Sequence, residues 1–147
     1  WRRCVMRPRA IAAGGPARGL LYGGADYFRH SAQTLLTFVM IESAEGLRNA
    51  DEILAVPGVD GVFVGPMDLG ISLGYSPDLP QLADEVETAI GTIQQAAQKA
   101  GKFAGIQTTS TAEAQRRVTQ GFRLVSIMAD TRMMRATATQ TLAALRA

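Results

Sequence analysis

Four short apolar runs, each followed by a helical pattern, constrain the fold of this chain more than any other feature of its sequence. The predicted strands are Leu35 to Ile41, Gly61 to Val64, Phe103 to Gln107 and Leu124 to Met128. The first is a continuous apolar run, which is typical of a strand buried on both faces of a parallel sheet. A helix after each strand returns the chain to the same edge, so the sequence predicts an α/β fold with a parallel sheet.

Capping signals and apolar stripes predict where the helices begin and which face they bury. Ser43 is a predicted N-cap, Ser110 and Glu113 form a predicted capping box, and Asp130 is expected to cap the last helix. A long helix is expected from Pro80 to Ala100. The predicted stripes are Leu47, Ala50 and Leu54; Leu82, Val86, Ile90, Ile93 and Ala97; and Met134, Ala138, Leu142 and Leu145.

The remaining segments are predicted to be less regular. Glycines between Gly14 and Gly24 indicate a loop, Ala25 to Thr34 a short helix, and Leu69 to Pro80 a second loop. The acids Asp84, Glu85 and Glu87 lie near a helix start, where the dipole favours them, and are interpreted as a solvated face.

Two of the predicted strands are followed by an acidic residue, Glu42 in the first case and Asp68 in the second. Strands of a parallel sheet end at the same edge, so these carboxylates are expected to converge. Oxygen ligands of this kind suit Mg²⁺ or Mn²⁺, whereas one cysteine, Cys4, and one histidine, His30, cannot build a zinc site. A simpler alternative is that Glu42 is a first-turn helix acid and Asp68 a turn residue.

The dipeptide Gly65-Pro66 predicts a tight turn after the second strand. Such a turn exposes the backbone N–H groups of Met67 and Asp68, which could hold a carboxylate. Glycine and proline alone indicate only the turn.

The stretch VMIESAEGLRNADEILAVPGVDGVFVGPMDLGISLGY closely resembles the signature of the HpcH/HpaI family of metal-dependent class II aldolases. The resemblance continues more weakly through GKFAGIQTTSTAEAQRRVTQGFRLVSIMADT. It implies the C-terminal half of a (β/α)₈ TIM barrel, built from about four βα units. It also implies cleavage of a 4-hydroxy-2-oxo acid to pyruvate and an aldehyde.

The same resemblance assigns roles to particular residues. Glu42 and Asp68 would bind a divalent Mg or Mn cation, and Gly65, Pro66, Met67 and Asp68 would cradle the pyruvate carboxylate. The base histidine and an arginine are expected in the other half of the barrel, so no catalytic residue is assigned in this chain. Lys99 and Lys102 flank a helix end rather than follow a strand, which argues against Schiff-base chemistry.

Three positions depart from the family pattern. Met40 stands where glutamine is common, Met128 where glycine is usual, and Gln107 where an apolar residue lies near the aldehyde pocket. The alternatives are therefore a lyase resembling the citrate lyase β subunit, and a non-catalytic half-barrel that binds a keto acid or a partner.

Length and charge complete the prediction. The 147 residues fit one domain, with a glycine- and arginine-rich segment at 1–34 and four βα units at 35–147. The chain starts at Trp1 and holds half the usual barrel, so we expect a fragment of a parent protein that forms a homo-oligomer.

Six arginines in residues 1–30 lack the aromatic pattern of nucleic-acid binding, and no run suits a membrane span or a signal peptide. A single cysteine fits a cytoplasmic protein.

Overall fold

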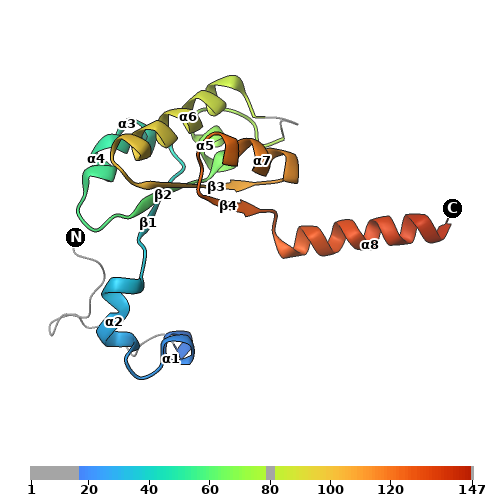
Figure 1. Cartoon of the computed structure of the whole chain (residues 1–147). Helices are drawn as coiled ribbons and strands as arrows, with labels where there is room; N and C mark the ends of the chain where they lie inside the picture. The colour runs from blue at the N-terminus through green and yellow to red at the C-terminus, as the bar shows by residue number, and fades with distance from the viewer. Residues whose placement is uncertain (1–16, 79–81, 147) are drawn as a thin grey trace.

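The computed structural model describes residues 17–78 and 82–146, which form a four-stranded parallel sheet with helices packed on one face (Figure 1). The strand order is β1-β2-β3-β4, the order in which the strands occur in the chain. The strands are β1 (Phe38–Ile41), β2 (Gly61–Val64), β3 (Phe103–Thr108) and β4 (Leu124–Ile127). The helices are α1 (Ala17–Gly23), α2 (Tyr27–Thr34), α3 (Ala44–Arg48), α4 (Ala50–Ala55), α5 (Pro66–Ser72), α6 (Asp84–Lys99), α7 (Thr111–Thr119) and α8 (Asp130–Arg146). The predicted α/β fold with four βα units is therefore confirmed.

The core lies between the sheet and helices α4, α5 and α6. Val62 and Val64 of β2 and Ile106 of β3 are fully buried against the apolar stripe of α6, as the sequence predicted. The buried part of that stripe comprises Val86, Ile90, Ile93 and Ala97. At about 25 cal/mol per Å² of apolar surface, such residues provide most of the driving force for folding.

The local signals for helix starts are largely confirmed. Ser43 caps α3 by accepting a 3.0 Å hydrogen bond from Gly46 N–H, and Ser110 accepts a 3.2 Å bond from Glu113 N–H at α7. The Glu113 side chain, however, accepts from the N–H of Thr109 rather than closing the reciprocal half of the capping box. Both helices thus begin where an oxygen side chain satisfies a first-turn N–H group.

Several predicted features differ in the structure. The long helix expected from Pro80 begins at Asp84, and Pro80 itself lies outside the described residues. The glycine-rich stretch contains helix α1 across Ala17–Gly23 where a loop was expected, and its part before residue 17 lies outside the described residues. The first strand is shorter and begins at Phe38. The first four residues of the loop expected from Leu69 to Pro80 belong to α5, which ends at Ser72, because Leu69 is fully buried and Gly70 fits closely against Val86.

Helix α8 extends away from the sheet and buries none of its residues (Figure 1). The apolar stripe that the sequence predicted there is exposed, with Met134 at 71%, Leu142 at 53% and Leu145 at 78%. Within the described ranges no helix has both the length and the apolarity to cross a membrane.

The other face of the sheet carries none of helices α3 to α7 and presents large apolar side chains (Figure 1). Alternation along the strands places Phe38, Met40, Phe63, Phe103 and Leu124 on this face, with Gly61 and Gly105 between them. A Cβ atom on Gly61 would lie 2.6 Å from the Phe38 ring, and one on Gly105 would lie 2.8 Å from the Phe63 ring. The glycines thus leave room for aromatic rings on the surface that faces inward in a closed barrel.

Candidate functional site

Glu42 and Asp68 come together at the carboxyl edge of the sheet, around the backbone of Gly65. Glu42 directly follows β1, and Asp68 lies in the first turn of α5, just after β2. A Cβ atom built on Gly65 would lie 2.8 Å from Glu42 Oε2 and 3.8 Å from Asp68 Oδ2. The two oxygens are therefore no further apart than the total of these distances, and one small ligand can reach both.

Gly65 is required at this point for space rather than for backbone conformation. Its φ of −99° is open to any residue, so no left-handed strain demands glycine. The side chain of Glu42 fills the volume that a methyl group would need, with Glu42 Cβ at 3.2 Å from the added atom. The missing side chain lets the Glu42 carboxylate lie over the end of β2.

The segment Gly65-Pro66 is the start of α5 rather than an isolated tight turn. Pro66 at the first helical position has no N–H group, so the first orphan donors of the helix belong to Met67 and Asp68. Met67 and Asp68 thus have their N–H groups at the start of a helix, where the sequence predicted a tight turn. Pro66 is half-buried and Met67 is 52% exposed.

A side-chain hydrogen bond joins the two segments that carry the acids. The N–H of Ala44 at the start of α3 donates to Ser72 Oγ at the end of α5, over 2.9 Å. This bond links the segment after β1 to the helix after β2. Glu42 is half-buried and Asp68 is exposed, so the site is open to solvent and to a ligand.

The donor set fits a hard divalent cation with incomplete protein ligation. In the described part of the chain, no three His, Cys, Asp or Glu side chains gather as a metal-binding group. Two carboxylates leave most of the six positions around Mg²⁺ for water and substrate oxygens, as is common for this ion. A zinc centre would need three or four protein ligands, which this arrangement does not offer.

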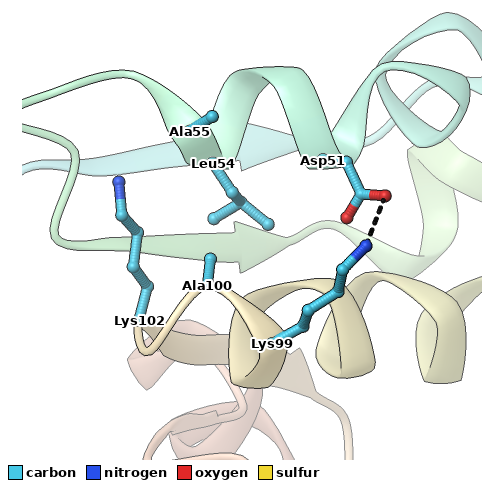
Figure 2. A pocket seen from close by; sticks show the side chains of 6 residues that line it. All are labelled: Asp51, Leu54, Ala55, Lys99, Ala100 and Lys102. Atoms are coloured by element: carbon cyan, nitrogen blue, oxygen red, sulfur yellow. Dashed lines mark hydrogen bonds and ion pairs between the residues drawn. The ribbon is translucent and has the colours of Figure 1, made fainter.

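A separate hollow lies between α4 and α6, and Figure 2 shows its lining. It encloses about 340 Å³ beside the residues that precede β3, at the opposite edge of the sheet from Glu42. Lys99 pairs with Asp51 at 3.3 Å (Figure 2). Lys102 donates to the Val56 carbonyl at 3.0 Å. Both lysines thus stabilise helix ends, and the structure gives neither a place at the carboxyl edge.

The prediction of a solvated acidic face on α6 is wrong for Glu87. Its carboxylate accepts two hydrogen bonds from the fully buried guanidinium of Arg117 on α7, and a third from Arg116. This pair could not be predicted from the sequence, because charged residues at helix starts are usually solvated. Asp84 and Glu85 are exposed, as expected.

Ser126 is a further residue of this edge that the sequence reasoning did not single out. It pairs in register with Gln107, and both are exposed. The period of two along β4 was the available signal, since it places Ser126 on the face opposite Val125 and Ile127.

Comparison with known proteins identifies the class. The sequence model of the HpcH/HpaI aldolase/citrate lyase family matches residues 5–137, and this chain belongs to that family. It is 39% identical over 140 residues to the hydroxypyruvate/pyruvate aldolase of Rhizorhabdus wittichii, covering 95% of this chain and 56% of that protein. The chain thus spans about half the length of the curated relatives it matches.

Solved structures confirm the architecture. An HpcH/HpaI aldolase/citrate lyase family protein from Burkholderia cenocepacia is 33% identical with a TM-score of 0.80, covering 94% of this chain and 53% of that one. A citrate lyase β subunit from M. tuberculosis, complexed with oxaloacetate and magnesium, is 23% identical to this chain, with a TM-score of 0.57. The match covers 67% of this chain and 49% of the citrate lyase subunit. The four βα units are arranged as in half of a (β/α)₈ barrel.

Proposed function

We propose that this chain carries the metal- and pyruvate-binding platform of a class II aldolase that cleaves a 4-hydroxy-2-oxo acid to pyruvate and an aldehyde. The observation that carries the proposal is the convergence of Glu42 and Asp68 on the side-chain-free position Gly65. Family membership makes the chain part of an aldolase or lyase. Metal dependence is our inference from the donor set, and the substrate class is what the resemblance to the family implies.

In this proposal Glu42 and Asp68 hold a Mg²⁺ or Mn²⁺ ion. Such a cation, when bound, offsets the negative charge that develops on the keto oxygen during carbon–carbon cleavage. The N–H groups of Met67 and Asp68 orient the substrate carboxylate, and Gly65 and Pro66 keep this surface free of side chains. The residues of this chain therefore bind and orient the keto-acid half of the substrate.

The proposed reaction breaks the bond between C3 and C4 of the substrate. The 4-hydroxyl group loses its proton and becomes the aldehyde carbonyl, while the bonding electrons pass to C3 and the 2-oxo group. Protonation of C3 then yields pyruvate. We assign the base for the first proton to no residue of this chain, so the isolated chain is expected to bind ligand without turnover.

Titration calorimetry with Mg²⁺ and oxalate, a mimic of the pyruvate enolate, tests the platform. We expect Glu42→Gln and Asp68→Asn each to weaken oxalate binding by at least about tenfold, equivalent to roughly 1.4 kcal/mol. Glu45→Gln is the matched control, since Glu45 is an exposed acid of the neighbouring α3. Equal binding by all four proteins would contradict the proposal.

A second measurement locates the ion directly. Paramagnetic Mn²⁺ should broaden the amide NMR signals of Gly65, Met67 and Asp68 in the wild-type chain, and Glu42→Gln should abolish this selectivity. Broadening centred on another part of the chain would contradict the assigned ligands. Turnover of a 4-hydroxy-2-oxo acid by the isolated chain would contradict the expectation that this chain lacks the catalytic base.

Partners and compartment follow from the same proposal. The partner is a small 2-oxo acid rather than a nucleic acid, and the parent protein is proposed to be a homo-oligomer in the cytoplasm. The single cysteine of the sequence supports that compartment.

A further inference from the structure

The register of the sheet places Glu42 in one row with residues of the other strands. Ile41, Val64, Ile106 and Val125 are aligned across the four strands. One residue further along each strand, the next row consists of Glu42, Gly65, Gln107 and Ser126, of which Gln107 and Ser126 are themselves paired. Successive residues point to opposite faces, so this row faces away from helices α4, α6 and α7.

This row differs in chemistry from the rest of the uncovered face. Earlier positions on that face are apolar, including Met40, Phe63 and Leu124. Gln107 and Ser126 are polar and exposed, and neither side chain makes a hydrogen bond within the described part of the chain. Their amide and hydroxyl groups are therefore available to a ligand.

The two polar residues lie on one side of Gly65, and the acidic Glu42 lies on the other. Strands are spaced by about 4.8 Å, so Glu42 and Gln107 are roughly 10 Å apart at the backbone. Gly65 has no side chain, and the space between them stays open. A keto acid anchored beside Glu42 and Asp68 can extend over Gly65 toward Gln107 and Ser126.

We propose that Gln107 and Ser126 are specificity residues that hydrogen-bond hydroxyl groups on the aldehyde portion of the substrate. This inference rests on the proposed function, because the acids fix the keto-acid end. The favoured substrate class is a 2-oxo acid with a hydroxylated chain beyond C4. A substrate with a plain alkyl chain would leave both polar groups without partners, at a cost for each lost hydrogen bond.

Two uncleavable ligands separate these substrate classes. We would compare 5,6-dihydroxy-2-oxohexanoate with 2-oxohexanoate by calorimetry in the presence of Mg²⁺, since neither has a 4-hydroxyl group. The wild-type chain is expected to bind the dihydroxy acid about tenfold more tightly, as two modest hydrogen bonds predict. Gln107→Leu and Ser126→Ala should each reduce the preference about threefold, because each removes one of the two hydrogen bonds.

Controls distinguish specificity from general damage. Gln98→Leu makes the same substitution on the exposed side of α6 and should keep the tenfold preference. Oxalate binding should be unchanged in all three variants, because oxalate has no atoms beyond the keto-acid portion. Equal affinity for both hexanoates, together with tight oxalate binding, would overturn this inference and leave the proposed function standing. Failure of the wild-type chain to bind oxalate would overturn both.

Discussion

Arg117 on α7 and Glu87 on α6 are joined by two parallel hydrogen bonds, of 2.6 Å from Nη1 to Oε2 and 2.9 Å from Nη2 to Oε1. Arg117 is fully buried, and its Nη1 also donates to Gln120 at 3.1 Å. Within the described residues its Nε has no hydrogen-bond partner. The buried guanidinium is thus held mainly by Glu87, which is 27% exposed, with a longer 3.5 Å contact from Nη2 to Glu113 Oε1.

Removing the charge of Glu87 should destabilise the fold more than removing Arg117. Glu87→Gln leaves the buried cation with only the longer 3.5 Å contact to Glu113, and we expect a loss of about 3 kcal/mol. Arg117→Met removes the buried charge and leaves Glu87 paired with Arg116 at 2.9 Å, so the expected loss is about 1 kcal/mol.

Urea unfolding of both variants checks this order. Asp51→Asn is the control, because the Asp51–Lys99 pair is exposed and should contribute less than about 1 kcal/mol. A larger loss in Arg117→Met than in Glu87→Gln would mean that packing of the arginine, not its charge pairing, stabilises the contact between α6 and α7.

Gly65→Ala should impair ligand binding more than folding. The added methyl group would lie 2.8 Å from Glu42 Oε2, so the carboxylate must move from its position beside Asp68. We expect oxalate binding in the presence of Mg²⁺ to weaken at least about tenfold, with a change in unfolding free energy below roughly 1 kcal/mol, because the clash involves a flexible side chain.

Gly91→Ala provides the comparison for this prediction. A Cβ atom at Gly91 in α6 would meet nothing within 4 Å, so the chain should gain up to about 1 kcal/mol from helix propensity and bind oxalate normally. Normal oxalate binding by Gly65→Ala would show that the space over Gly65 is not needed by the ligand.

The sheet could be predicted from the sequence because its signal is local. The second strand was placed at Gly61 to Val64 and occurs there, and helix starts at Ser43 and Ser110 follow from their own hydroxyl groups. Convergence of Glu42 and Asp68 could also be anticipated, since both follow parallel strands.

Features that depend on distant contacts could not be predicted. Helix α5 contains Gly70, which disfavours a helix, and burial of Leu69 offsets that preference, while Pro66 at the first position is compatible with a helix start. The role of Gly65 depends on the position of the Glu42 side chain, which only the register between β1 and β2 fixes.

Tyr75 should titrate later in the folded chain than in the unfolded one. A hydrogen bond to Glu85, with smaller effects of burial and of the carboxylate charge, raises the pKa of Tyr75 above its ordinary value of 10.0. The folded state therefore keeps a proton that the unfolded state loses, and this contribution to stability is present below the unfolded pKa and lost as the pH rises through the folded pKa.

Ultraviolet absorbance of the phenolate measures this titration, with Tyr75→Phe subtracted to isolate one of the three tyrosines. Glu85→Gln should return the pKa of Tyr75 toward the ordinary value, because it removes the negative charge and weakens the acceptor. An unchanged titration in Glu85→Gln would rule out this carboxylate as the cause.

Met128 has a left-handed backbone directly after β4, with a φ of +54°, and its N–H donates to the Thr108 carbonyl at 3.0 Å. Residues with a Cβ atom lose about 1 kcal/mol in this conformation, whereas glycine does not. Met128→Gly should therefore be more stable than Met128→Ala by about 1 kcal/mol, although alanine is normally the more stabilising of the two. Thermal or urea unfolding of the pair isolates the backbone term, because neither variant retains the methionine side chain. If Met128→Ala proved the more stable variant, the left-handed conformation at the end of β4 would not persist in solution.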